Sequence, residues 1–148
     1  MYRQILVATD GSALAKNAVD HGINLAKALG VPIIFVTVTE MWSALDIASE
    51  SVQGVQHPME TYEAMARNAA HKILTACEKI AEAERVNFET VHVPDKTPAE
   101  GIIATAIEKN CDLIVMASHG RRGLRRMMLR SQTAEVLAHS KVPVLVLR

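Results

Sequence analysis

Cysteine and aromatic residues are scarce in this chain of 148 residues. It contains two cysteines, and Phe, Trp and Tyr together make up 3% of it. Cys77 and Cys111 stand far apart, with neither a C-x-x-C pair nor a histidine at ligand spacing. This pattern argues against a zinc site and against a dithiol redox motif, and it predicts two buried free thiols. The shortage of aromatic rings argues against a surface on which nucleic-acid bases stack.

Neither sign of charge is in excess. Lys and Arg number 16, Asp and Glu number 16, and the formal net charge is zero. A neutral chain attracts nucleic acids and membrane surfaces only weakly at long range. One segment departs from this balance, because ten residues contain five arginines: Arg121, Arg122, Arg125, Arg126 and Arg130. The sequence leaves three interpretations of this basic segment: a solvated loop, a site that recognises phosphate or nucleotide, and, least favoured, a nucleic-acid site.

Long apolar runs are also missing. No stretch approaches the roughly 20 apolar residues of a membrane-spanning helix. The apolar run at residues 5–8 is too short for the core of a signal peptide, and Asp10 interrupts it. We therefore expect a cytoplasmic protein. With 49% hydrophobic and 22% charged residues, the composition predicts one folded domain over residues 1–148.

Short apolar runs alternate with helical patterns along the chain. The expected strands are 5–8, 32–38, 88–93, 112–116 and 142–147. The expected helices begin at Ser12, near Pro58, at Thr97 and at Ser131. This alternation predicts a Rossmann-like α/β fold, an open and doubly wound five-stranded parallel sheet of order 3-2-1-4-5 with helices on both faces.

The second expected helix has a clear apolar stripe. It runs to about Arg85, and its apolar residues follow one another in steps of four or three: Met65, Ala69, Ile73, Ala76, Ile80 and Ala83. Such a stripe ordinarily packs against the core. Residues 41–57, which precede this helix, have no clear period and are expected to form a long loop.

Ligands of such sheets bind beyond the carboxyl ends of the strands. Three loops qualify, those after Ala8, Val38 and Met116, and the first and third are neighbours if strands one and four pair. The loop after Met116 contains two glycines and the arginines, and it leads into the helix that begins at Ser131. Glycines and a helix N-terminus are the usual elements of a phosphate site.

Three segments resemble the universal stress protein family. They are the opening Ile-Leu-Val-Ala-Thr-Asp-Gly-Ser, the strand and loop Asp-Leu-Ile-Val-Met-Ala-Ser-His-Gly-Arg-Arg-Gly, and the ending Ser-Lys-Val-Pro-Val-Leu-Val. The resemblance covers the whole chain at the length of a single-domain member. Members that bind ATP carry the motif G-x-x-G-x9-G-[ST], and members without these glycines form a second class that does not bind ATP detectably.

This chain matches that motif in part. Gly120 and Ser131 agree with it, whereas Ala117 replaces the first glycine and Arg130 the third. Ala117 adds one methyl group. Arg130 has two possible effects: a side chain there obstructs backbone contact with phosphate, at a cost of roughly 1 kcal/mol or more if φ is positive, or its guanidinium pairs with phosphate directly.

The resemblance also implies where a nucleotide binds. The candidate nucleotide-binding residues are Ala8, Asp10, Val38, Met116, Ala117, Gly120, Arg130, Ser131 and Gln132. By the resemblance, Asp10 contacts the adenosine end and the backbone of Val38 meets the adenine. The alternatives are that Asp10 only shapes a turn or helix start and that Val38 is only a core residue.

The same resemblance assigns the phosphate side of the site to the second end motif. Met116, Ala117 and Gly120 would line the ribose and phosphates. Ser131 and the N–H of Gln132 would hold the terminal phosphates. Ala8 stands where the family often has proline or alanine.

The sequence offers little support for an enzyme. It lacks the G-x-x-x-x-G-K-[ST] and G-x-S-x-G motifs. Ser118 and His119 are adjacent, and adjacent residues seldom converge as a nucleophile and its base. No residue is an evident general base for attack by water.

Three functions follow in order of preference. The first is a stress-response protein that binds ATP as a regulatory ligand, with or without Mg²⁺, and for which AMP or ADP are alternative ligands. The second is an interaction module of the same fold that has lost nucleotide binding through Ala117 and Arg130. It acts through its dimer surface and basic loop on a regulatory protein partner that the sequence does not name. The third is a slow ATP hydrolase. Because residues 142–147 would form an exposed apolar sheet edge, we expect a homodimer through this strand, which the resemblance also implies.

Overall fold

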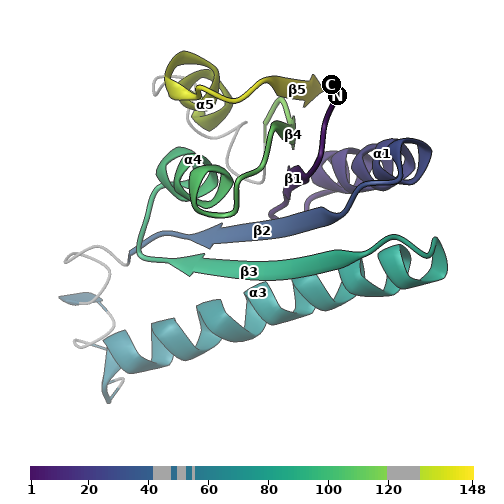
Figure 1. Ribbon diagram of the computed structural model, residues 1–148. Helices are drawn as coiled ribbons and strands as arrows, with labels where there is room; N and C mark the ends of the chain where they lie inside the picture. The colour runs from purple at the N-terminus through teal and green to yellow at the C-terminus, as the bar shows by residue number, and fades with distance from the viewer. Residues whose placement is uncertain (42–47, 50–52, 55, 120–130) are drawn as a thin grey trace.

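The computed structural model describes residues 1–41, 48–49, 53–54, 56–119 and 131–148 (Figure 1). Strands and helices alternate along this part of the chain. The strands are β1 (Ile5–Ala8), β2 (Ile33–Thr39), β3 (Phe88–Pro94), β4 (Leu113–Ala117) and β5 (Val144–Leu147). The helices are α1 (Ala13–Leu29), α3 (Pro58–Ala83), α4 (Pro98–Glu108) and α5 (Gln132–His139).

The five strands form one parallel sheet of order β3-β2-β1-β4-β5. β1 lies at its centre, where Ile5 is paired with Ile33 of β2 and with Leu113 of β4. Helices α1 and α3 cover one face, and α4 and α5 cover the other. The predicted fold class and strand order are therefore confirmed.

The central strand divides the core in two. Ile5 and Val7 point into the cluster beneath α1 and α3, and Leu6 and Ala8 point into the cluster beneath α4 and α5. Since a parallel strand covered on both faces has no solvent side, its residues form a continuous apolar run. This explains the unbroken apolar sequence of β1.

Two helices approach the sheet closely because glycine stands at the contact. A Cβ atom added at Gly22 of α1 would lie 2.5 Å from Cγ2 of Val7, and one added at Gly101 of α4 would lie 2.5 Å from Cγ2 of Val38. Both distances are far below a van der Waals contact. Because glycine has no side chain, α1 and α4 can lie this close to β1 and β2.

The predicted helix ends are confirmed. Ser12 caps α1 by accepting a hydrogen bond from the N–H of Ala15, and Gly30 ends the helix at φ 68°. Thr97 and Glu100 form the capping box of α4. The long segment 41–57 lies largely outside the described residues. Within it, residues 48–49 are helical, so the expectation of a loop throughout was wrong there.

The predicted apolar stripe of α3 does not pack against the sheet. The helix buries Ala70, Leu74, Cys77 and Ala81 instead. Met65 is 66% exposed and Ile80 39% exposed. The two stripes lie side by side on the helix, and the sheet covers only one of them. Among the helices that the structure describes, none is long and apolar enough to cross a membrane.

Replacement of Gly22 by alanine tests the close contact between α1 and β1. Overpacking of a tight core costs about 1–3 kcal/mol, and the higher helix propensity of alanine returns up to about 1 kcal/mol. We expect Gly22→Ala to lower the free energy of unfolding by about 1–2 kcal/mol in urea titrations. Asn17→Ala, on the exposed side of the same helix, is the control and should be neutral or slightly stabilising. A stabilised Gly22→Ala protein would contradict the contact.

The thiol of Cys77 provides a test that depends on pH. Burial, followed by the nearby charges of Glu78 and Asp20, raises the pKa of this thiol from 9.0 to about 11. The folded protein thus holds this proton more tightly than the unfolded chain. The resulting stabilisation is complete below about pH 9 and is lost as the pH rises through 11.

We therefore expect iodoacetamide to alkylate native Cys77 at pH 8 about 100-fold more slowly than the urea-unfolded chain, because the thiolate is the nucleophile. Mass spectrometry of timed digests measures both rates. The Cys111→Ser protein is used for this measurement, because Cys77 is then its remaining thiol and all alkylation occurs there. Equal rates in the folded and unfolded chains would contradict the described burial.

Candidate functional site

The strand order reverses between β1 and β4, at the centre of the sheet. From β1 the chain proceeds outward to β2 and β3, and later returns to the other side for β4 and β5. The loops after Ala8 and Ala117 therefore leave the same edge of the sheet next to each other. The prediction that these two loops are neighbours is confirmed. In parallel sheets, ligands usually bind between two such loops.

The loop between β1 and α1 is held by its own side chains. The N–H of Ser12 donates to Oδ1 of Asp10 at 2.9 Å, and the N–H of Gly11 donates to Oγ1 of Thr9 at 3.2 Å. Gly11 has φ 77°, a conformation that suits glycine. Asp10 thus shapes the helix start, as one of its two interpretations predicted. A role of Asp10 in nucleotide binding remains a prediction.

Buried threonines fix the carbonyl groups at this edge. Oγ1 of Thr37 donates to the carbonyl oxygen of Thr9 at 2.8 Å. Oγ1 of Thr133 donates to the carbonyl oxygens of Ala117 and Ser118, at 3.0 and 2.8 Å. Neither residue was among the candidates predicted from the sequence. The signal was a hydroxyl inside an otherwise apolar strand, as at Thr37, because such a group must find a partner when buried.

The N-terminus of α5 faces the same edge. Oγ of Ser131 accepts a hydrogen bond from the N–H of Ala134 at 3.1 Å and so caps the helix. Oε1 of Gln132 accepts one from the N–H of Ala99 at 3.0 Å, which ties the start of α5 to the start of α4. The first amides of a helix carry partial positive charge, which favours an anion at this position.

Three further candidate residues lie on one face of the sheet. Ala8 and Met116 are buried in the cluster beneath α4 and α5, and the half-buried Val38 packs against that cluster. The side chain of Val38 contacts the position of Gly101. Val38 is therefore also a packing residue, in line with its second interpretation. Its backbone contact with adenine remains a prediction.

Ala117 fits the structure without strain. It is 7% exposed at the end of β4. Its φ is not positive, unlike that of Asn110 or Asp95. The replacement of glycine at this position therefore costs no backbone strain. Of the other three motif residues, Ser131 is described, whereas Gly120 and Arg130 lie outside the described residues.

Ser118 and His119 do meet, contrary to expectation. Oγ of Ser118 lies 3.1 Å from Nδ1 of His119. A nucleophile and its base also need a third group that orients the base. Within the described part of the chain no carboxylate contacts His119. What the described residues show is a hydrogen bond between two side chains near the surface.

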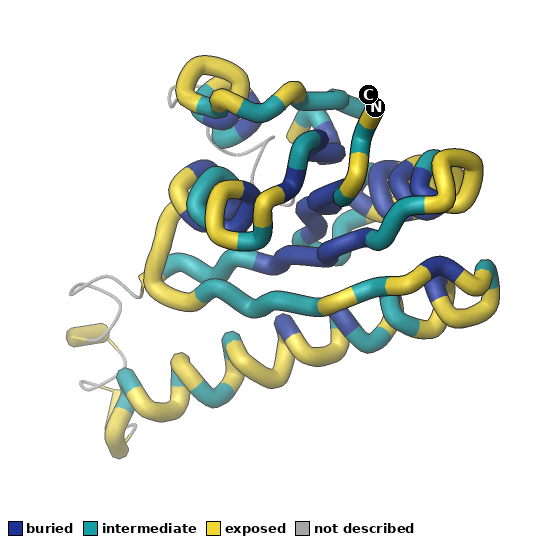
Figure 2. The backbone as a smooth tube through the Cα atoms, viewed as in Figure 1, coloured by how far each residue is buried: buried dark blue, intermediate teal, exposed yellow. Residues whose placement is uncertain are grey.

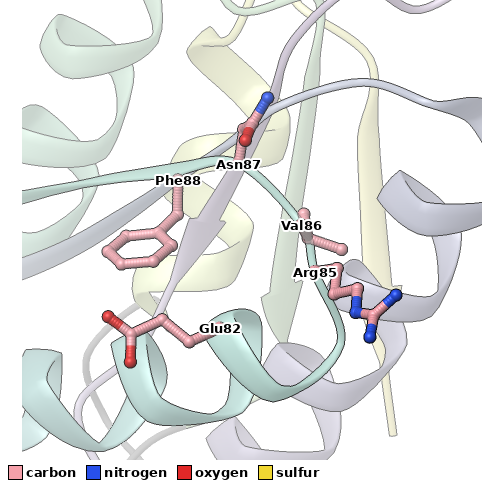
Figure 3. Close-up of a pocket in the computed structure, with 5 residues that line it drawn as sticks. All are labelled: Glu82, Arg85, Val86, Asn87 and Phe88. Atoms are coloured by element: carbon pink, nitrogen blue, oxygen red, sulfur yellow. The ribbon is translucent and has the colours of Figure 1, made fainter.

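Two hollows lie away from the junction of β1 and β4. The larger, of 590 Å³, is lined by Glu82, Arg85, Val86, Asn87 and Phe88 (Figure 3). These residues end α3 and begin β3, so this hollow is at the amino end of the sheet. The loops at that end connect helices to strands, where parallel sheets seldom bind ligands.

The smaller hollow, of 300 Å³, lies at the carboxyl ends of β2 and β3, and Thr39, Arg67, His92 and Asp95 are among its lining residues. Oγ1 of Thr39 and Nε2 of His92 are 2.8 Å apart. Burial lowers the pKa of His92, Arg67 lowers it further, and Asp95 opposes both effects. An uncharged imidazole is therefore favoured at neutral pH.

The described residues do not hold a metal by themselves. No group of three or more His, Cys, Asp or Glu residues among them is arranged to bind a metal ion. Mg²⁺ commonly binds through one or two carboxylates together with the phosphates of a nucleotide. Asp10 is the candidate residue with a carboxylate at the junction of β1 and β4, and a bound Mg²⁺ would depend mainly on phosphate oxygens.

Comparison with known proteins identifies the family. Residues 1–148 match the Universal stress protein family. Universal stress protein YxiE of Bacillus subtilis is 31% identical over 152 residues, with 100% of both chains covered. The solved structure of MJ0577, a universal stress protein of Methanocaldococcus jannaschii, has a TM-score of 0.74 at 28% identity and covers 99% of this chain and 96% of its own.

A universal stress protein solved in complex with cAMP has a TM-score of 0.70 at 24% identity, covering 99% of this chain and 97% of its own. This second likeness is one of fold. Fold, strand order and sequence agree along the whole length, and the chain belongs to the universal stress protein family.

Proposed function

We propose that this protein binds an adenine nucleotide, ATP in the first place, at the junction of β1 and β4 and acts as a regulatory stress-response protein. The observation that carries the proposal is the capped N-terminus of α5 beside the ends of these two strands. The resemblance puts the terminal phosphates at Ser131 and the N–H of Gln132, and these two residues begin this helix. The complex of a related fold with cAMP supports the adenine part.

The described half of the site suits both ends of a nucleotide. Ala8, Val38 and Met116 share the α4 and α5 face of the sheet and form an apolar side. Ser131 and Gln132 begin α5 and form the polar side. An adenine ring needs apolar contact together with a few backbone hydrogen bonds, and phosphates need N–H donors and positive charge.

In this proposal the protein binds ATP without hydrolysing it rapidly. His119 is held by Ser118 and lacks a carboxylate partner within the described residues, so it is a poor general base. Mg²⁺, where present, would neutralise phosphate charge. A cytoplasmic location belongs to the same proposal, and the two free, buried thiols fit a reducing compartment.

An interaction module without nucleotide is the second candidate, and Arg130 is the observation that favours it. Ala117 does not, since its backbone tolerates a side chain. The choice between the two functions thus depends on one residue.

The nucleotide proposal is tested on the freshly purified protein. We expect acid denaturation to release adenine nucleotide, identified by chromatography, and Mg-ATP titration calorimetry of the stripped protein to show saturable binding. Arg130→Gly then determines what the arginine does. Binding about tenfold weaker marks it as a phosphate ligand, because one charge-assisted contact is lost. Tighter binding marks it as an obstruction.

Arg85→Gly is the matched control, because it removes the same charge from an exposed position at the amino end of the sheet, where φ is positive and suits glycine. It should leave ATP binding unchanged. Absence of released nucleotide together with absence of heat and of a thermal shift with Mg-ATP would overturn the proposal and leave the interaction module.

The dimer is a separate part of the proposal. The carbonyl groups of Pro143, just before β5, and of Leu147 accept hydrogen bonds from the N–H groups of Ile114 and Ser118. The N–H and carbonyl groups of Val144 and Val146 therefore point to the open edge. Val146→Pro removes an outward N–H while the hydrogen bonds to β4 stay. We expect a dimer for the native protein at micromolar concentration and a monomer for Val146→Pro.

Analytical ultracentrifugation measures both masses, and circular dichroism checks that the variant is folded. The control is Lys141→Ala, an exposed position that precedes residues 142–147. A monomeric native protein at these concentrations would refute the dimer and leave nucleotide binding untouched.

A further inference from the structure

Packing against the sheet does not explain the regular apolar stripe along α3. We name the residues Met65, Ala69, Ile73, Ala76, Ile80 and Ala83 the outer stripe of α3. The sheet does not cover this stripe, because α3 packs through Ala70, Leu74, Cys77 and Ala81. Apart from the half-buried Ile73, its members are exposed. Figure 2 shows α3 dark blue toward β3 and yellow over much of its remaining surface.

The spacing of the outer stripe is that of a helix-pairing seam. From Ala69 the steps are four, three, four and three, and isoleucine alternates with alanine. This is the a and d pattern of a coiled coil, in which residues of one helix insert between those of another. From Met65 to Ala83 it extends along about 27 Å of helix. Small alanines at every second position let a partner helix approach closely.

The charges beside the stripe indicate what kind of helix pairs with it. Lys72 stands three residues after Ala69 and four before Ala76, and Lys79 repeats this position one heptad later. On a helix, residues at these distances are surface neighbours. Both lysines are exposed, and neither has a carboxylate partner within the described part of the chain. In a coiled coil, the residues that flank the seam of one helix contact those that flank the seam of the other. A partner helix would therefore place its flanking residues against Lys72 and Lys79.

A second copy of this chain does not satisfy these charges. Antiparallel pairing of two α3 helices would bring the same flank of each together and set lysines against lysines. Parallel pairing would set Lys72 and Lys79 against the opposite flank, which is Ala70 and Cys77 and is buried against the sheet. The seam thus favours a partner with acidic flanks.

We propose that the outer stripe of α3 is a docking surface for an amphipathic helix of another protein, with apolar residues at heptad positions a and d and glutamate or aspartate beside them. This surface lies on the α1 and α3 side of the sheet. The nucleotide residues Ala8, Val38 and Met116 lie on the opposite side. Nucleotide and partner can therefore be bound at the same time.

The test uses a synthetic peptide of about three heptads with leucine at a and d and glutamate at e and g. The glutamates keep the peptide from pairing with itself. A matched peptide carries lysine at e and g. Fluorescence anisotropy of the labelled peptides is measured against the whole native protein. We expect saturable binding of the glutamate peptide at micromolar concentration and at least tenfold weaker binding of the lysine peptide.

Two variants separate charge from shape. The double variant Lys72→Glu, Lys79→Glu should lose at least tenfold in affinity for the glutamate peptide and gain affinity for the lysine peptide. Its control, Lys96→Glu with Lys141→Glu, makes the same change of net charge at exposed positions elsewhere and should bind as the native protein does. Ala76→Arg adds bulk within the stripe and should weaken binding of the glutamate peptide, although the new charge attracts it.

All substituted positions are exposed, and circular dichroism verifies each fold. The proposal is overturned if neither peptide binds saturably, if the two double variants weaken binding equally, or if Ala76→Arg binds unchanged. It is also overturned if ultracentrifugation shows a native oligomer that Ala76→Arg dissociates, because a second copy would then occupy the stripe.

Discussion

Burial of β1 on both faces is the constraint from which the rest of the structure follows. Ile5, Leu6 and Val7 are fully buried, and they point alternately into two separate clusters. A parallel strand covered on both faces requires a layer of helices on each side, and right-handed crossovers supply them. The chain must then reverse its direction of travel across the sheet. That reversal leaves the ends of β1 and β4 side by side without a crossover between them, which is where the candidate site lies.

The strand content, order and caps could be predicted because each depends on local sequence. Apolar runs of four to seven residues and residues such as Ser12, Gly30 and Thr97 act within one turn of their own position. The packing face of α3 could not be predicted in this way. Two stripes of similar spacing run along that helix, and a sequence pattern does not tell which of them meets the sheet. In the folded protein the stripe that contains Leu74 and Cys77 is the one that packs against the sheet.

The candidate site shows a similar division. The ends of the strands and the start of α5 followed from the alternation of elements. The contacts of Thr37 and Thr133 did not, since each joins segments far apart in the chain. For Ser118 and His119 the prediction was wrong in the opposite way. Because the two residues are adjacent, their side chains were not expected to meet, but they form a hydrogen bond.

Hydrogen bonds within the protein organise the described half of the site. Ser131 caps α5, Asp10 closes the turn before α1, and Thr133 holds the end of β4 through hydrogen bonds within the protein. A nucleotide that binds there meets groups already in position, so little conformational entropy is lost on this side. The same organisation explains why Asp10 and Ser131 stabilise the fold whether or not nucleotide binds. The presence of Asp10 and Ser131 in the sequence thus cannot distinguish the two functions. Arg130 can, because its side chain either obstructs phosphate or pairs with it.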